Sequence, residues 1–186
     1  MPFKKTLTMG ILILLIGALF PMKSQSQSPN HQYVLLNRVA YYKVKVKPEI
    51  VGWTNEGFRI NFIILEGRIN GIISGEFVKD RDIVVNGSST INGDQATILS
   101  NGVGSMSLKS KIVTDDGIIF ILSYTGAFHL TKFPLKYPIV FLTAVITLST
   151  EIDNPRYDII TQKNYLGKGE LNVLTNEVSY RIYPTY

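Results

Sequence analysis

The stretch Ser107–Gly126, SLKSKIVTDDGIIFILSYTG, constrains the fold of this chain more than any other part of it. Two β-rich runs meet at Thr114-Asp115-Asp116-Gly117. Asp-Gly there predicts a two-residue hairpin turn, because Asp and Gly best tolerate the positive φ that both central residues need. The run before the turn alternates apolar and polar residues, whereas Ile118–Leu122 is apolar on both faces. Since such a strand must be covered on both sides, we expect the hairpin to lie in the middle of a closed antiparallel sheet.

The N-terminal residues Met1–Ser26 have the three parts of a secretory signal peptide. Lys4 and Lys5 form its basic start, Met9–Phe20 forms its apolar run, and a polar tract follows. The apolar run is shorter than the about 20 residues that a transmembrane helix needs. We therefore predict a cleavable signal peptide, with an uncleaved N-terminal anchor left open as the alternative.

The remaining length suits a single domain. The predicted organisation is a signal peptide over residues 1–26, a linker over 27–32 and a β-barrel domain over 33–186. Such a chain is expected to be secreted or periplasmic, with no stable membrane insertion after cleavage.

Charge and cysteine content exclude several functions. The 186 residues contain no cysteine, which excludes disulfides and thiol nucleophiles. The formal charge is +5, but Lys4, Lys5 and Lys23 lie in the leader, and without them the charge is +2. A charge that small and dispersed does not indicate a nucleic-acid partner.

Short β segments separated by turn signals make up the rest of the chain, which is typical of a sandwich or barrel. A Pro residue, Pro48, is expected to end the second segment, and Ile139–Leu148 is expected to be a buried strand or a short core helix. Hairpin signals occur at Asn86-Gly87, Asn92-Gly93 and Asn101-Gly102. Further strands are predicted at Tyr33–Leu36, Val39–Val46, Phe58–Glu66, Thr97–Ser100, Tyr157–Gln162, Asn164–Gly167 and Val178–Tyr183. The predicted fold class is therefore all-β, a single closed antiparallel β-barrel.

Glycines recur at Gly67, Gly71 and Gly75, where they predict bulges or sharp bends at barrel corners. A second group, Gly167-Lys168-Gly169, superficially resembles a phosphate-binding loop. Because no helix follows it, a bulge is the better interpretation.

Several turn elements occur in a characteristic order along the chain. They are Gly93-Asp94, Asn101-Gly102, Thr114-Asp115-Asp116-Gly117, Gly126, Pro155-Arg156-Tyr157 and Gly167-Lys168-Gly169. This order resembles the family called domain of unknown function 3237, and the resemblance extends from Val34 to Tyr183. It implies a calycin-like small β-barrel with a cavity and no established activity. Ser107 and Lys109 stand where the family tends to have Asp and Arg, and Ile159-Ile160-Thr161 stands where it tends to have Trp-Leu-Asn. If these positions line the cavity, the departures imply a more apolar pocket with fewer charges than is typical of the family.

Nine polar residues are candidates for lining the cavity or its mouth. Polar groups that point into a small barrel need partners or a ligand. For Arg59 and Asn61 the alternative is that they lie on an outward face in contact with water. Residues near strand ends are candidates for the mouth, and three residues on strands could stabilise developing charge. The candidates are Arg59, Asn61, Glu66, Asp94, Lys109, Tyr124, His129, Arg156 and Tyr157. Asp115 and Asp116 are explained by turn formation, and no catalytic residue is assigned.

The histidines, His31 and His129, are too few and too isolated for a zinc site or a histidine-based triad, and no metal or cofactor is predicted. The first functional hypothesis is an exported barrel that binds a small apolar or amphipathic molecule in its cavity. This hypothesis requires that the protein's own side chains leave the cavity open. A second is a cofactor-independent isomerase, cyclase or hydrolase, which requires at least two ionisable groups within hydrogen-bond reach inside the barrel. A small outer-membrane barrel is the third, and a homo-oligomer is left open because of the apolar runs.

Overall fold

The computed structural model of this chain describes residues 38–130, 138–152 and 154–185. The predicted signal peptide, the linker and the strand expected at Tyr33–Leu36 lie outside these residues. The described elements are β1 (Ala40–Thr54), β2 (Gly57–Gly71), β3 (Gly75–Phe77), β4 (Asp82–Val85), β5 (Ser88–Ile91), β6 (Gly93–Ile98), β7 (Val103–Thr114), β8 (Ile119–His129), β9 (Ile139–Thr150), η1 (Pro155–Tyr157), α2 (Asp158–Thr161), β10 (Asn164–Asn172) and β11 (Glu177–Pro184).

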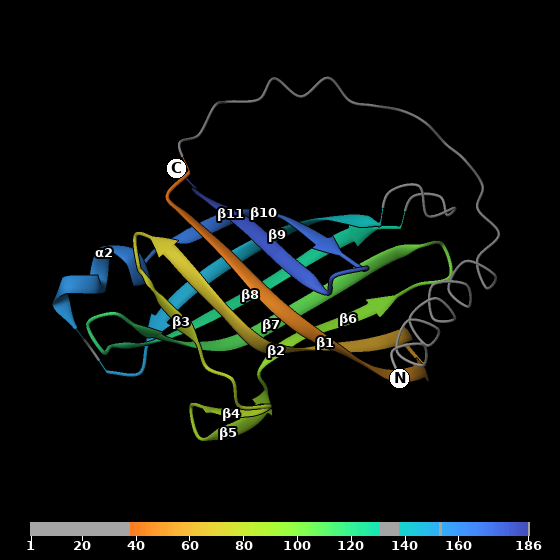
Figure 1. The fold of residues 1–186 in the computed structure, drawn as a ribbon, viewed down its shortest axis with the longest axis horizontal. Helices are drawn as coiled ribbons and strands as arrows, with labels where there is room; N and C mark the ends of the chain where they lie inside the picture. Colours follow the sequence, from red (N-terminus) through yellow and green to blue (C-terminus); the bar gives the residue numbers. More distant parts are fainter. Residues whose placement is uncertain (1–37, 131–137, 153, 186) are drawn as a thin grey trace.

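The long strands form one antiparallel sheet whose pairings run in a ring (Figure 1). The order is β1-β11-β10-β9-β8-β7-β3-β2-β6, and additional pairings join β1 to β2 and β7 to β6. A separate two-stranded sheet, β4–β5, lies on the outside of this ring (Figure 1). The prediction of an all-β fold built on a large antiparallel sheet is confirmed.

The doubly apolar run after the central turn is covered on both faces, as its composition requires. Phe120 and Leu122 are fully buried inside the ring. Ile121 points outward and is only 4% exposed, because it packs with Ile83 and Val85 of the β4–β5 hairpin. The hairpin therefore protects the outer apolar face of β8 from water.

Two apolar clusters fill the interior of the ring. The larger cluster contains Phe77, Phe120, Ile146 and many other buried side chains. A smaller cluster contains Ile60 and Ile98, with Phe58, Phe62, Phe128 and Leu130 packed against it. One side of β2, with Ile60 and Ile64, therefore faces the interior as the alternation predicts.

The prediction that Pro48 ends a strand is wrong. β1 continues to Thr54, and Pro48 pairs with Phe62 of β2. The ladder between β1 and β11 stops at Lys45, although Val46 N still donates to Asn176 O at 2.8 Å, and beyond that point β2 is the one described strand that pairs with β1. On such an edge a missing backbone N–H interrupts no ladder, which explains why proline is tolerated there.

The central turn also differs from its prediction. Thr114 N donates to Ile118 O at 2.9 Å, and Gly117 N donates to Thr114 O at 2.8 Å. Gly117 has a φ of 83°, whereas Asp116 does not have a positive φ. The connection is therefore a three-residue loop with a left-handed glycine, not a two-residue turn. By contrast, Asn86 (φ 50°) and Gly87 (φ 77°) form the predicted two-residue turn between β4 and β5.

Three further predictions need correction. Tyr157–Gln162 is not a strand, because η1 and α2 occupy it; Asn154 caps Arg156 N at 3.1 Å and Pro155 begins the helical turn. Asn92-Gly93 is not a turn, because Asn92 is fully buried and its Nδ2 donates to Val78 O. Gly167 and Gly169 form no bulge, since β10 pairs without a break to both its neighbours.

Other predictions concern the glycines of β2 and β3 and the apolar run Ile139–Leu148. Gly71 ends β2 and Gly75 begins β3, so these two glycines flank the connection between two antiparallel strands and not a bulge within a strand. The β1–β2 ladder has register shifts at Lys45/Val46 and Ile50/Gly52, and the first lies near Gly67 but not on it. The apolar run Ile139–Leu148 is a strand, although its outward face is exposed and Phe141 is 71% accessible.

Candidate functional site

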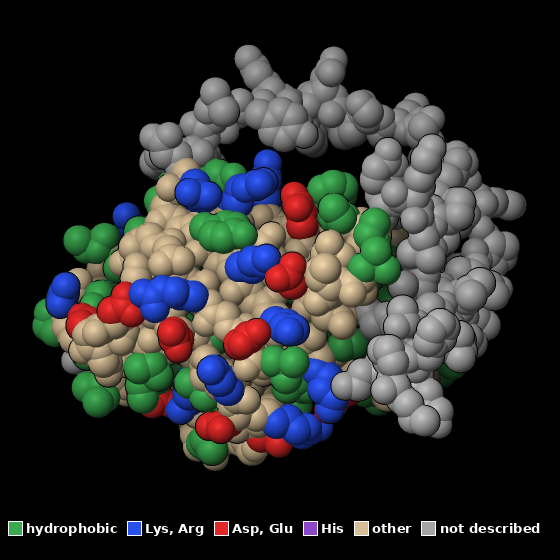
Figure 2. Space-filling model, in the orientation of Figure 1, with side chains coloured by type: hydrophobic (Ala, Val, Ile, Leu, Met, Phe, Trp, Pro, Cys, Tyr) green, Lys and Arg blue, Asp and Glu red, His purple; other side chains and the backbone are tan. Residues whose placement is uncertain are grey.

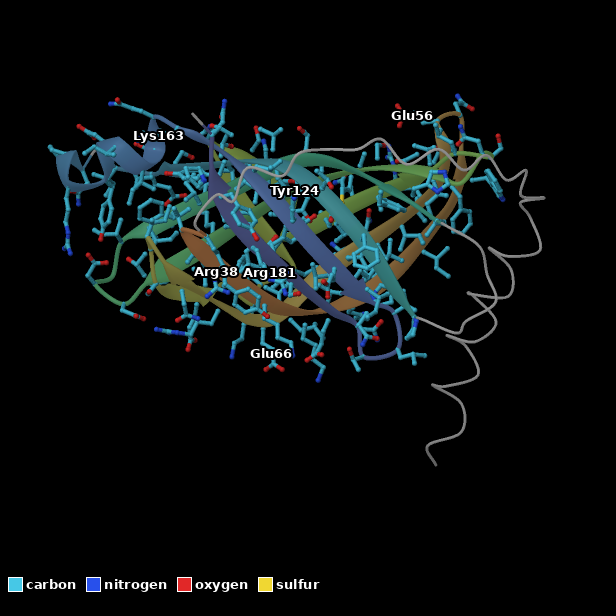
Figure 3. All side chains as sticks on the ribbon, turned by 90° about the horizontal axis from the view of Figure 1, so that it is seen from above. Arg38, Glu56, Glu66, Tyr124, Lys163 and Arg181 are labelled. Carbon is cyan, nitrogen blue, oxygen red and sulfur yellow. The ribbon has the colours of Figure 1, made fainter. Side chains whose placement is uncertain are left out.

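A carboxyl group and a phenol meet inside the ring. Tyr124 of β8 donates its hydroxyl proton to Oδ2 of Asp94 on β6 at 2.5 Å, and both side chains are buried. Leu108 of β7 lies in register between them, so the two side chains reach towards each other across one strand. Figure 3 shows Tyr124 between the walls of the ring. The arrangement provides the two ionisable groups in contact that an enzyme hypothesis requires.

Two more tyrosines surround this pair. The ring of Tyr180 lies 5.3 Å from that of Tyr124 and 5.2 Å from that of Tyr42, measured between centroids. The Tyr180 hydroxyl donates to the sulfur of Met106 at 3.6 Å. Three tyrosines from β1, β8 and β11 therefore converge beside one carboxyl group.

Glycines on β10 make room for the Tyr180 ring. Gly169 lies directly opposite Tyr180 in the β10–β11 ladder. A Cβ atom added at Gly169 would come within 2.7 Å of two ring atoms of Tyr180, and one at Gly167 would come within 3.0 Å of a third. Gly167 and Gly169 therefore leave space for the aromatic ring of Tyr180 to pack against the backbone of β10, and they do not form a phosphate-binding loop.

Burial changes the acidity of Asp94. Desolvation raises the pKa of its carboxyl group from 3.8 to about 7, although the hydrogen bond from Tyr124 acts in the opposite direction. The same burial raises the pKa of Tyr124, and the charge of Asp94 raises it further. Near neutral pH, Asp94 is therefore present both as a proton donor and as a proton acceptor.

Two polar atoms in this region lack a hydrogen-bond partner among the residues that the structure describes. They are Oδ1 of Asp94 and the hydroxyl of Tyr42. Buried polar groups are nearly always paired, because leaving one unpaired costs about 1–3 kcal/mol. An acceptor and a donor are thus available to a bound molecule in the interior.

Three of the other candidate residues lie on β2. Ile60 and Ile64 face the interior, whereas Arg59 and Asn61, on the opposite side of the strand, are half-buried. Arg59 pairs with Glu56 at 2.8 Å, and Glu66 is exposed, 4.0 Å from Lys45. Glu66 points away from the ring in Figure 3. These three residues are therefore not brought together with Asp94 and Tyr124.

The remaining candidates occupy three different places. Lys109 is exposed on β7 and lines an outer groove of about 420 Å³ beside the β4–β5 hairpin. His129 is exposed at the end of β8. Arg156 and Tyr157 lie in η1, at the same end of the ring as the turn after β7.

Asp116 links that turn to η1. Its carboxylate accepts hydrogen bonds from the hydroxyls of Thr114 at 2.6 Å and Tyr157 at 2.5 Å, and from Arg156 at 3.0 Å. The hydrogen bond from Thr114 contributes most to lowering the pKa of Asp116, followed by that from Tyr157, and the charge of Arg156 lowers it further. These hydrogen bonds hold η1, and α2 which follows it, at one end of the ring. Asp116 therefore has a structural role, linking the turn after β7 to η1.

The sequence interpretation missed Tyr42, Tyr180 and Met106. Tyr42 and Tyr180 both lie on the inward parity of predicted strands, so the alternation of Val39–Val46 and Val178–Tyr183 carried the signal. Gly167 and Gly169 marked the space for a large ring on the neighbouring strand. Among the described residues, no group of three or more His, Asp or Glu side chains lies close enough to hold a metal ion.

Comparison with known proteins identifies the fold. The family model described as "Protein of unknown function (DUF3237)" matches residues 35–185. None of the curated proteins compared with this chain matches it.

In the part of the chain that the structure describes, no helix is both long and apolar enough to cross a membrane.

Solved structures from three organisms resemble this one at low sequence identity. A beta-barrel like protein from Acinetobacter baumannii AYE has a TM-score of 0.64 and 18% identity, covering 86% of this chain and 99% of that one. A protein of unknown function from Clostridium acetobutylicum ATCC 824 has a TM-score of 0.63 and 17% identity, covering 82% and 100%. An enzyme from Penicillium herquei has a TM-score of 0.51 and 15% identity, covering 87% and 99%. At these identities the similarities concern the fold.

Proposed function

The chain belongs to the DUF3237 family, and from this premise we propose that it is a cofactor-independent enzyme in which Asp94 transfers protons, supported by Tyr124. The observation that carries the proposal is the buried Asp94–Tyr124 pair, with a carboxyl pKa of about 7. A raised pKa produced by desolvation is a common property of catalytic carboxyl groups. The Penicillium herquei relative is itself described as an enzyme.

The proposed reaction moves one proton within a small molecule. The Asp94 carboxylate accepts a proton from a C–H or O–H group of the substrate, whose electron pair stays in the substrate. The resulting carboxylic acid then returns the proton to another atom of the same molecule. Isomerisation and ring closure balance in this way without a co-reactant, whereas hydrolysis would also consume water. We therefore favour an isomerase or cyclase over a hydrolase.

The fold supports a site inside the ring. The ring of pairings is consistent with a closed, calycin-like barrel, and Asp94 is paired in register with Phe62, which packs against both apolar clusters. Phe62, which is opposite Asp94 in register, and Phe128 are only half-buried. A small, mostly apolar substrate would reach Asp94 past these two aromatic side chains.

Binding without turnover is the second candidate function. The observation in its favour is the flexible side chain of Met106, whose terminal methyl occupies the space left by Gly126. A methionine can give way to a small apolar or amphipathic ligand at little cost. The larger cluster is filled by the protein's own side chains, which goes against the open cavity expected for this function, so a ligand would bind only by displacing side chains such as Met106.

We also propose that the domain functions outside the cytoplasm. The basic, apolar and polar parts of Met1–Ser26 support export, and the absence of cysteine is compatible with it. Figure 2 shows lysine, arginine and acidic side chains interspersed over β1 and β2. Ion pairs such as Lys43–Glu177 at 2.8 Å support an outer surface that faces water.

Deuterium exchange tests the proposed activity. The full chain is incubated in D₂O with a panel of small enolisable ketones and phenols, and NMR follows replacement of substrate hydrogens. Wild-type protein is expected to catalyse exchange, and Asp94→Asn is expected to lose it by about 100-fold or more, as a missing general base implies. Asp80→Asn, which changes an exposed aspartate, is the matched control. Equal exchange rates for Asp94→Asn and wild type would contradict the proposal.

A further inference from the structure

We infer that the Tyr42 hydroxyl holds the oxygen of a substrate carbonyl group, so that the substrate is an enolisable carbonyl compound. This inference rests on the proposed function, because it assumes that Asp94 removes the proton next to that carbonyl. It adds a third catalytic group and a substrate class to the site.

The first support is the unpaired state of two buried atoms. Tyr42 is 0% exposed, and its hydroxyl makes no hydrogen bond of normal length and angle with the described residues, although the Tyr124 side chain lies near enough to act on its pKa. Asp94 Oδ1 likewise makes no such hydrogen bond. The phenol offers a proton and the carboxylate oxygen accepts one, so together they match a molecule that presents an acceptor and a removable proton.

The second support is the rigid position of the Tyr42 ring. It stacks on Tyr180 at 5.2 Å with an interplanar angle of 26°, and it contacts the ring of Phe77 at 5.4 Å. Tyr180 is opposite Tyr42 in the β1–β11 ladder and also contacts Tyr124. Packing on both sides fixes the direction of the hydroxyl, as preorganised catalysis requires.

Electrostatics keep this hydroxyl protonated. Burial, and after it the charges of Tyr180 and Asp94, raise the pKa of Tyr42 well above its ordinary value, and the nearby Tyr124 side chain offsets only part of this rise. Tyr42 therefore remains a neutral donor throughout the physiological pH range. A ligand oxygen that carries lone pairs and no proton of its own, such as a carbonyl oxygen, is the matching partner.

The chemistry balances without a cofactor. Asp94 Oδ1 takes the proton from the carbon next to the carbonyl, and the C–H electron pair becomes a carbon–carbon double bond. The carbonyl π electrons move onto oxygen, where the Tyr42 hydroxyl stabilises the enolate by hydrogen bonding. In a β,γ-unsaturated ketone the enolate oxygen then re-forms the carbonyl, the carbon–carbon double bond moves to the α and β carbons, and the γ carbon takes the proton back from Asp94, which gives the α,β-unsaturated isomer. Losing one donor to such an oxygen typically lowers the rate by about 100–1000-fold.

The variant Tyr42→Phe separates this role from a structural one. Because the hydroxyl makes no hydrogen bond of normal geometry with the described residues, its removal should leave the free energy of unfolding unchanged or slightly higher. A hydroxyl with a structural hydrogen bond would instead cost about 1–3 kcal/mol on removal. Tyr41→Phe is the matched control, since Tyr41 is adjacent in sequence and points to the opposite face of β1.

The experiment uses 2-cyclohexen-1-one labelled with ¹³C at the carbonyl and the full chain. In wild type, Tyr41→Phe and Asp94→Asn, the bound carbonyl signal should move downfield as the oxygen accepts a hydrogen bond, and in Tyr42→Phe it should not. Deuterium exchange into the probe should fall about 100-fold in Tyr42→Phe. No downfield signal in wild type, or an unchanged signal in a destabilised Tyr42→Phe, would overturn the inference.

The two proposals fail differently. If Asp94→Asn stops exchange but Tyr42→Phe keeps the downfield signal and the exchange rate, the proposed function stands and the role of Tyr42 falls. If Asp94→Asn exchanges hydrogens as fast as wild type, the proposed function falls and the enolate scheme falls with it.

Discussion

Tyr124 donates a 2.5 Å hydrogen bond to Asp94 across the interior of the strand ring, over the side chain of Leu108. The two residues are 30 positions apart in the sequence, and they meet because β6 and β8 both pair with β7. Their contact places a carboxyl group of raised pKa inside a domain that is otherwise filled by apolar side chains. The burial and the raised pKa of Asp94 therefore determine how the stability of the domain should depend on pH.

The free energy of unfolding should fall as pH rises from about 4 to about 7. Asp94 has a pKa of about 7 in the folded state and an ordinary value of 3.8 when unfolded. Between these values the folded state binds a proton that the unfolded state does not, so raising the pH favours unfolding. The loss amounts to roughly 4 kcal/mol and levels off above the folded pKa. Urea unfolding at a series of pH values measures it.

Asp94→Asn should abolish this slope, whereas the exposed Asp80→Asn should leave it in place. The side chains that face Asp94, namely Tyr42, Tyr124 and Tyr180, have raised pKa values and stay neutral in this window. Asp116, Glu49 and Glu177 have lowered pKa values, so their opposite effect on stability occurs at lower pH. A wild-type stability that rises between pH 5 and about 7 would contradict the role given to Asp94.

Tyr124→Phe should destabilise the protein and raise the pKa of Asp94 further. The change removes the hydrogen bond that lowers this pKa and leaves a buried carboxyl oxygen without its donor. The expected cost is about 1–3 kcal/mol, and the pH-dependent fall in stability should extend to higher pH than in wild type. The same urea series checks both effects. An unchanged upper limit of the slope would show that the hydrogen bond does not control the pKa.

Much of the fold could be predicted from local patterns. The doubly apolar run Ile118–Leu122 required a cover on both faces, and the structure provides it with the β4–β5 hairpin and the interior. Alternation in Phe58–Ile64 identified the inward face of β2 because the period of a strand is two. Asn86-Gly87 formed its expected turn since both residues have positive φ.

Other features depend on contacts between distant segments. Pro48 remains in a strand because β11 ends its pairing at Lys45, which the sequence around Pro48 does not reveal. Tyr157–Gln162 has a strand-like composition, but the cap from Asn154 and the link from Asp116 to Tyr157 favour a helical turn. Asn92 resembles a turn residue, yet its side chain binds Val78 O and the Ser110 hydroxyl.

In the candidate site, too, the sequence indicates individual residues, whereas their contacts depend on how distant strands pair. Asp94 and Tyr124 were both candidates, but their contact depends on the register of β6, β7 and β8. Arg59 and Glu66 were chosen for their charge, and both are paired with nearby residues on the sheet surface. Alternation puts Tyr42 and Tyr180 on the inward faces of their strands, but their contact depends on the pairing of β11 with β1 and with the glycines of β10.

Gly169→Ala should destabilise the domain by about 1–3 kcal/mol, because overpacking forces buried side chains to move. Its Cβ atom would lie 2.7 Å from atoms of the Tyr180 ring, which is held in place by Tyr42 and Tyr124. Thr143→Ala, at an exposed position on β9, is the control and should change the unfolding free energy by less than about 0.5 kcal/mol. Similar stability of the two variants would show that the ring does not rest on Gly169.

Tyr157→Phe should loosen the helical turns without disturbing the sheet. The change removes one of the hydrogen bonds to Asp116 and should cost about 1 kcal/mol. Hydrogen exchange of the backbone amides in Pro155–Thr161 should accelerate, while exchange in β7 and β8 should remain at the wild-type rate. Uniform acceleration in both regions would indicate that the link to Asp116 supports the whole domain.

The most direct test of the central claim is a pH titration of the Asp94 carboxyl carbon by ¹³C NMR, with Asp94→Asn used to assign the signal. The predicted result is a midpoint near 7, in agreement with a desolvated carboxyl group bonded to Tyr124. A midpoint at or below the ordinary aspartate value would mean that Asp94 is a permanently charged residue at neutral pH. That result would contradict its proposed role in proton transfer.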